Sequence, residues 1–160
     1  MDDLSAAERE LHAGVHRALD NFDYESATWL CERLRCSVLA RQPTRLTHAE
    51  PDHALTLLLA QCHARAGKPN VAYALLKGCS LPAHCFLLAS CCFELQKWHE
   101  AELALTGGGS GSPAAHNMDR KRDRDGLPVS VPNGAAGFHL LGKICECVAR
   151  RFALTAFQFI

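Results

Sequence analysis

The strongest constraint on the fold is a spacing of Ala and Leu that occurs twice in the middle of the chain. A Leu-Ala pair is followed twelve residues later by a second Ala and four residues after that by a Leu, and the whole set recurs after 29 residues. The two copies are Leu59-Ala60, Ala72 and Leu76, then Leu88-Ala89, Ala101 and Leu105. Self-similarity at a fixed period is typical of repeat proteins, in which each unit covers its neighbour's apolar face. Small residues at fixed positions predict paired helices that approach closely.

Apolar residues elsewhere follow the same helical periodicity, and no segment alternates as a strand does. Ser5 and Glu8 form a capping-box pattern at the start of the first helix, which ends near Asn21–Asp23. The other predicted helices cover Tyr24–Cys36, Ala54–Ala66, Val71–Lys77, Pro82–Lys97 and Trp98–Leu105, and helical character resumes at Phe138–Val148 and beyond. The predicted fold class is therefore all-α, built from antiparallel helix pairs with short turns.

Composition divides the chain into three parts. Residues 1–105 hold three predicted repeats, apart from a Pro- and Thr-containing loop at Ser37–Pro51. Residues 106–137 are rich in Gly, Ser, Pro and alternating charges, which predicts a long flexible insert. Residues 138–160 form an incomplete fourth repeat. We therefore expect about 3.5 repeats and interpret the chain as a fragment or a truncated product.

The helix pairs resemble the tetratricopeptide repeat, which is a helical hairpin of about 34 residues that stacks into a solenoid. The matching positions extend to Ala27, Cys31 and Leu34 in repeat one and to Leu141, Gly142 and Cys145 in repeat four. A HEAT-like or generic three-helix bundle is the alternative. The resemblance implies close repeat packing at Ala27, Ala60, Ala72, Ala89, Ala101 and Gly142.

Charge and hydropathy exclude several classes of protein. Lys and Arg together number 17, as do Asp and Glu, so the formal net charge is zero and the positive surface of a nucleic-acid binder is not expected. No stretch approaches the roughly 18 apolar residues of a membrane span. The N-terminus, MDDLSAAERE, is not a secretory signal. These features predict an intracellular protein that binds neither nucleic acid nor membrane.

Nine cysteines and nine histidines raise the question of metal or redox chemistry. Structural zinc sites prefer close pairs such as C-x₂-C, whereas the close cysteines here are Cys91-Cys92 and Cys145-x-Cys147. His12 and His16 stand one helical turn apart, but no further ligand shares their spacing. The chain also has no nucleophile elbow, P-loop or HExxH motif. We expect buried core thiols and surface histidines, with no catalytic residue, metal or cofactor; a metal or redox protein is the third hypothesis.

Two blocks, AYALLKG at 72–78 and LLASCCFEL at 87–95, depart from the generic repeat consensus. With TWLCERL at 28–34 and the later LLGKIC, they are similar to the N-terminal domain of the cell-division-cycle tetratricopeptide family of the anaphase-promoting complex. The resemblance implies a non-catalytic scaffold of a multisubunit ubiquitin ligase, acting in mitosis, in nucleus and cytoplasm. Its implied partners are other subunits of that complex and a second copy of the chain. A free-standing peptide-binding adaptor is the alternative.

Repeat one carries the residues expected at the homodimer interface. Apolar side chains form a stripe on its first helix and continue on its second, although the end of a solenoid normally presents a polar face. The predicted interface residues are Leu11, Val15, Leu19, Phe22, Trp29 and Leu30. In the family that the chain resembles, the N-terminal helices of one subunit lie in the groove of the other.

Overall fold

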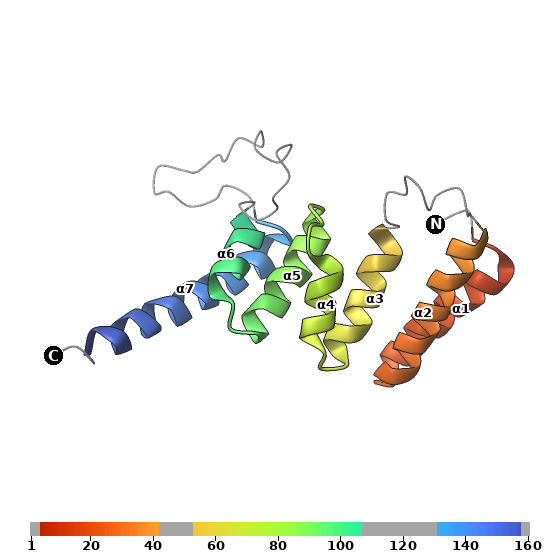
Figure 1. Ribbon diagram of the computed structural model, residues 1–160, viewed down its shortest axis with the longest axis horizontal. Helices are drawn as coiled ribbons and strands as arrows, with labels where there is room; N and C mark the ends of the chain where they lie inside the picture. The colour runs from red at the N-terminus through yellow and green to blue at the C-terminus, as the bar shows by residue number, and fades with distance from the viewer. Residues whose placement is uncertain (1–3, 42–52, 107–130, 158–160) are drawn as a thin grey trace. The chain divides into compact units, whose positions relative to one another are not determined.

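A computed structural model describes residues 4–41, 53–106 and 131–157, and within these ranges all regular secondary structure is α-helical (Figure 1). The prediction of an all-α chain built on tetratricopeptide-type helical hairpins is confirmed. Its helices are α1 Ala6–Asp20, α2 Tyr24–Arg41, α3 His53–Arg65, α4 Pro69–Leu76, α5 Pro82–Glu94, α6 Trp98–Thr106 and α7 Gly134–Phe157. The chain divides into two compact units, Met1–Leu75 and Leu76–Ile160.

Three of the helix pairs are joined by the same tight turn. In each turn one residue adopts a left-handed conformation: Phe22 has φ 60°, Gly67 has φ 69° and Gln96 has φ 59°. The amide after that residue donates to a carbonyl five residues earlier, at 2.9, 2.9 and 2.8 Å respectively. This is the arrangement of a Schellman-type helix end, which satisfies carbonyls that the helix leaves open. The turns define equivalent positions in the three hairpins.

Equivalent positions after the turn carry the small residues that the repeat predicted. The fifth residue after each left-handed residue is an alanine, and Ala27, Ala72 and Ala101 all have no solvent exposure. Seven residues before the turn lie Ala60 and Ala89, which are also fully buried. Alanine at a fully buried helix position leaves room for a neighbouring helix to approach closely.

Repeat one differs at the position seven residues before its turn, where Val15 replaces alanine. Val15 has no solvent exposure and belongs to the core of the first unit, which α1, α2 and α3 build together. That core consists of Val15, Leu19, Ala27, Cys31, Leu58, Leu59 and Cys62. Leu75 of α4 packs against it.

In the second unit, α5 packs on α6, and α7 contacts both. Its core includes Leu88, Ala89, Cys91, Cys92, Ala101, Leu105, Leu141 and Ile144. The ring of Phe93 meets that of Trp98 edge to face across the α5–α6 turn, with centroids 5.1 Å apart. Such aromatic pairs stabilise the helix ends that they join.

Several helix boundaries differ from the sequence prediction, and the largest differences are in α2 and α7. α2 continues through Ser37–Arg41, which the loop prediction had excluded from the helix. α7 begins at Gly134 instead of Phe138 and runs unbroken to Phe157. Its early start has a steric cause: a Cβ on Gly137 would lie 2.0 Å from the carbonyl oxygen of Pro132, so only glycine lets the preceding turn fold onto the helix.

Residues 106–137 were predicted to form a flexible insert, but 107–130 lie outside the described residues. Most of the predicted loop at Ser37–Pro51 lies outside them as well. In the described part of the chain, no helix has the length and apolar character needed to cross a membrane.

Candidate functional site

The predicted interface residues divide into two groups in the structure. Val15 and Leu19 are buried in the core of their own unit, where they pack with Ala27 and Cys31. Both side chains are therefore used by the hairpin itself, and they offer little surface to a second molecule. The repeat equivalence explains this, because Val15 occupies the position that Ala60 and Ala89 occupy in the other hairpins.

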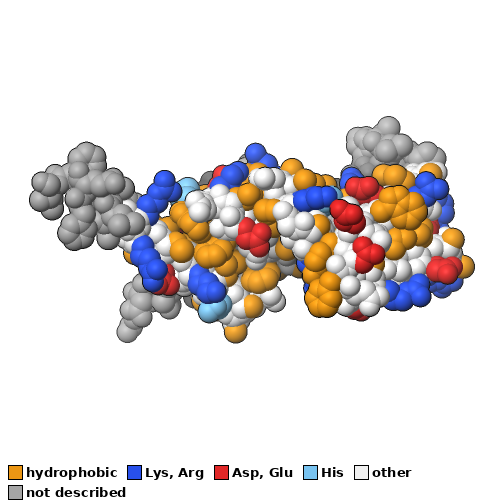
Figure 2. Space-filling model, turned by 90° about the horizontal axis from the view of Figure 1, so that it is seen from below, with side chains coloured by type: hydrophobic (Ala, Val, Ile, Leu, Met, Phe, Trp, Pro, Cys, Tyr) orange, Lys and Arg blue, Asp and Glu red, His pale blue; other side chains and the backbone are white. Residues whose placement is uncertain are grey.

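Phe22 and Trp29 behave differently, because their side chains are 77% and 61% exposed. Leu11 and Leu30 are half-buried, and Leu30 packs against the core of the first unit. We call Phe22 and Trp29, with the half-buried Leu11 and Leu30, the repeat-one surface. Figure 2 shows exposed hydrophobic side chains among acidic ones on the α1–α2 hairpin.

Phe22 is the unusual member of this surface. It holds a left-handed backbone conformation, which costs an L-residue roughly 1–2 kcal/mol relative to glycine. Its ring gains one contact that partly offsets this, an edge-to-face arrangement with Tyr24 at a centroid distance of 6.3 Å. The same position holds Gly67 and Gln96 in the other two turns. An exposed aromatic ring at a strained position is the kind of feature that a binding partner stabilises.

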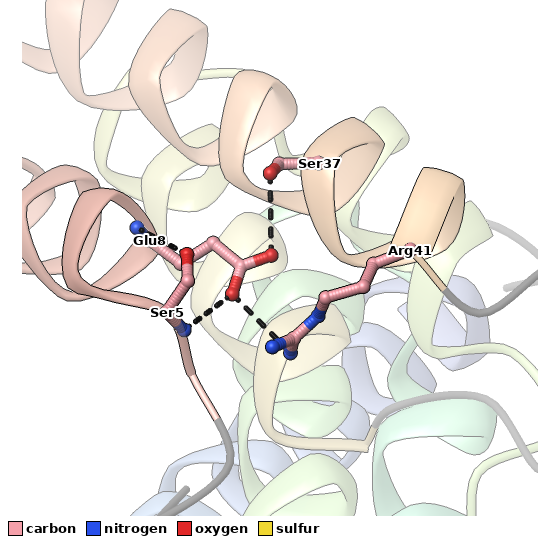
Figure 3. A network of polar contacts seen from close by, with 4 residues as sticks. All are labelled: Ser5, Glu8, Ser37 and Arg41. Carbon is pink, nitrogen blue, oxygen red and sulfur yellow. Dashed lines mark hydrogen bonds and ion pairs between the residues drawn. The ribbon is translucent and has the colours of Figure 1, made fainter.

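A buried carboxylate fixes the hairpin that carries this surface (Figure 3). Glu8 of α1 accepts from the Ser5 amide at 2.7 Å and from the Ser37 hydroxyl at 3.2 Å, and its Oε2 lies 3.2 Å from Nη2 of Arg41. The Ser5 hydroxyl in turn accepts from the Glu8 amide at 3.3 Å, which completes the predicted capping box. The hydrogen bond from the Ser5 amide is the main cause that lowers the pKa of Glu8 below its usual value.

Sequence reasoning identified Glu8 only as a helix cap. Its contacts with Ser37 and Arg41 cross 29 and more residues and depend on α2 extending to Arg41. The charge pattern of the sequence could have indicated these contacts. The first turn of α1 is acidic and the last turn of α2 is basic, and the two turns meet when the helices are antiparallel.

Most thiols in the cores lie in environments that raise their pKa, whereas the hydrogen bond with Cys31 lowers the pKa of the Cys62 thiol. Burial raises the pKa of Cys91 and of Cys92 to about 11 each, and it also raises the pKa of Cys85. Cys31 is hydrogen-bonded to Cys62, and this bond together with burial raises the pKa of the Cys31 thiol. A thiol that stays protonated near neutral pH is a weak nucleophile. These cysteines act as small apolar side chains that fill the cores.

His12 and His16 lie on one face of α1 with ring centroids 4.7 Å apart. Partial burial, followed by the neighbouring His16, lowers the pKa of His12. His12 therefore favours the neutral imidazole.

Gly142 differs in burial from the other predicted packing residues. It is exposed on α7, and a Cβ built on it would meet no atom within 4 Å. The alanines of the set are all fully buried.

Comparison with known proteins places the hairpins in a family. Residues 20–107 match the family described as "Anaphase-promoting complex, cyclosome, subunit 3". The chain is 36% identical over 116 residues to the human protein named "Cell division cycle protein 27 homolog". These 116 residues make up 71% of the chain and 13% of the human protein. It is 31% identical over 137 residues to "Cell division cycle protein 27 homolog B" of Arabidopsis thaliana, covering 86% of the chain and 15% of that relative.

Proposed function

Since the chain belongs to the family of subunit 3 of the anaphase-promoting complex (cyclosome), we propose that it is a non-catalytic scaffold module of a multisubunit ubiquitin ligase that acts in the cell cycle. It would assemble as a homodimer through repeat one and bind other subunits of the complex, in nucleus and cytoplasm. The chain spans only 13–15% of the length of the human and Arabidopsis relatives that it matches.

The observation that carries the proposal is the exposure of Phe22 and Trp29 on a hairpin whose interior is complete. Val15 and Leu19 fill the core, so the hairpin does not need these two aromatic side chains for its own packing. Aromatic residues are enriched at the centres of protein interfaces, where each buried ring contributes on the order of 1.5–3 kcal/mol. In a dimer with two-fold symmetry, the same two rings of each copy lie in the interface, so each residue contributes to it twice.

The test is sedimentation equilibrium of the full chain at micromolar concentration. Phe22→Asp should weaken self-association about 10- to 100-fold and leave the helical circular dichroism unchanged, because the side chain is exposed. Val71→Asp is the matched control: Val71 is also an exposed apolar residue, at 42%, but it lies on α4. A monomeric wild-type chain, or equal weakening by both variants, would contradict homodimerisation through repeat one.

Val15→Asp distinguishes interface from core. Val15 has no exposed surface, so a carboxylate there is buried in the core and should unfold the hairpin. We expect a loss of helical signal together with any loss of association. If Val15→Asp dissociated the dimer without loss of helicity, the assignment of Val15 to the intramolecular core would be wrong.

The peptide-binding adaptor is an outcome of the same experiment. A chain that is monomeric at all concentrations, yet binds a peptide from another subunit, would favour the adaptor over the homodimeric scaffold.

A further inference from the structure

Two cysteines meet in the core of the first unit, where α2 packs on α3. Cys31 of α2 and Cys62 of α3 belong to the same cluster of buried side chains, and neither residue has any solvent exposure. The Cys31 thiol is hydrogen-bonded to the Cys62 sulfur, so the two side chains are in direct contact. Both residues lie within one unit of the chain, and their contact does not depend on the proposed dimer.

The equivalence of the turns shows that a cysteine at position 31 is a departure from the repeat. The ninth residue after the left-handed residue is Cys31 in the first hairpin, Leu76 in the second and Leu105 in the third. All three side chains are buried. The fifth residue before the left-handed residue is Cys62 in the second hairpin and Cys91 in the third. Repeat one therefore has a thiol where the other two hairpins have leucine, and this thiol is the one that meets Cys62.

We propose that Cys31 and Cys62 are a site of oxidative modification, at which a hydroperoxide such as hydrogen peroxide converts the two thiols into a disulfide. The cross-link joins α2 to α3 and so connects the first repeat covalently to the second. Direct contact of the side chains favours this bond, because cysteines whose side chains point apart are not bridged without backbone movement. Burial selects the oxidant, since local opening of the helix packing admits a small peroxide more readily than a bulky thiol such as glutathione.

The reaction takes place in two steps. In the first step the Cys62 sulfur attacks one oxygen of hydrogen peroxide and the O–O bond breaks. Cys62 becomes a sulfenic acid, and its thiol proton leaves with the second oxygen as water. In the second step the Cys31 sulfur attacks the Cys62 sulfur, the S–S bond forms and the S–O bond breaks, and the Cys31 proton leaves in a second water molecule. The two thiols together lose two electrons, and one peroxide molecule gains them.

The hydrogen bond between the thiols determines which sulfur reacts first. It is the main cause that lowers the pKa of the Cys62 thiol, which burial opposes and the positive charge of Arg65 assists. The thiolate is the nucleophilic form of cysteine, so Cys62 is the attacking residue. Cys31 keeps its proton until the second step, because the same hydrogen bond and burial raise its pKa.

The experiment treats the full, reduced chain with hydrogen peroxide, blocks the remaining thiols with N-ethylmaleimide and maps the tryptic peptides by mass spectrometry. Cys31 and Cys62 fall in different tryptic peptides, 18–33 and 46–65, and neither peptide contains another cysteine. We expect these two peptides to be linked by a disulfide that a reductant cleaves. The link should form about tenfold faster, or more, than one between Cys62 and Cys36, which is exposed on the same helix as Cys31.

Variants and unfolding test whether the native contact is the cause. Cys31→Ala should abolish the link to peptide 46–65, whereas Cys36→Ala, the matched control on α2, should leave its yield unchanged. Because Cys31 is buried, helical circular dichroism is measured first, and Cys31→Leu serves as a second variant that introduces the residue of the other two hairpins.

Oxidation of the chain in urea, which separates α2 from α3, should lower the yield of the link between Cys31 and Cys62 about tenfold. Equal yields in the folded and the unfolded chain would overturn the proposal. The same conclusion would follow if the two peptides stayed unlinked at a peroxide dose that oxidises all of the exposed Cys36.

Discussion

Replacing Ala72 by leucine tests the repeat packing directly. Ala72 has no solvent exposure, whereas Ala74, two residues along the same helix α4, is exposed. Leucine has nearly the helix propensity of alanine, so neither change disturbs the helix itself. The difference between the two variants therefore reports only whether a neighbouring helix occupies the space beside residue 72.

The expected magnitude follows from this burial. The larger side chain of Ala72→Leu has no solvent-exposed space to enter, and overpacking of a close-packed site costs about 1–3 kcal/mol. For a chain of this length, each kcal/mol lowers the melting midpoint by about 2–4 °C, so the fall should be roughly 2–12 °C. Ala74→Leu should stay within about 0.5 kcal/mol of wild type.

Thermal unfolding followed by circular dichroism, with urea titration as a second measure, provides the comparison. The slope of the urea transition should be the same for both variants if only the folded state is affected. Equal midpoints for Ala72→Leu and Ala74→Leu would refute the close approach of helices at the repeated alanines.

Two further predictions concern single residues. Since the folded-state pKa of Glu8 is lowered, the stability that Glu8 contributes is present above its unfolded pKa near 4.5 and is lost as pH falls through the folded pKa. Glu8→Gln should therefore lower the free energy of unfolding at pH 7 and flatten the acid limb of a pH-dependent urea titration. Glu10→Gln, at an exposed position of the same helix, should leave the stability at pH 7 unchanged. Gly67→Ala should destabilise the chain by about 1 kcal/mol because of its left-handed φ, and Gly142→Ala, in an exposed helical position, should stabilise it by about 0.5–1 kcal/mol. Neither added methyl group meets another atom within 4 Å, so opposite signs in thermal melts would isolate backbone conformation as the cause.

Local patterns predicted the helices well because their causes are local. The capping box at Ser5 and Glu8 and the spacing of Ala60 and Ala72 depend on contacts within a turn or within one hairpin. Helix ends were less predictable. The last turn of α2 is bound to Glu8, whose side chain reaches Ser37 from 29 residues away, and single-segment periodicity does not contain that contact.

The assignment of the apolar stripe was harder for a related reason. A stripe on α1 shows which side chains avoid water, but not which helix covers them. Val15 and Leu19 became core residues because α2 and α3 both reach them. Val15 is identified as a core residue by its equivalence to Ala60. This equivalence follows from the shared left-handed conformation of the turns at Phe22 and Gly67, which the sequence does not show.

The residue at the left-handed turn position distinguishes repeat one from the other two hairpins. At the left-handed turn position, Gly67 has no side chain to strain and Gln96 presents a polar one, so both suit an exposed turn. Phe22 has neither advantage: its backbone conformation is unfavourable, and its ring is 77% exposed. Because the core beneath it is already filled, the ring contributes little to the stability of the isolated hairpin beyond its contact with Tyr24. At a protein concentration where the chain is monomeric, Phe22→Gly should therefore maintain or raise the melting temperature, and at higher concentration it should weaken self-association, a combination that a purely structural role for Phe22 does not produce. A lower melting temperature at a protein concentration where the chain is monomeric would show instead that the ring serves the fold of repeat one.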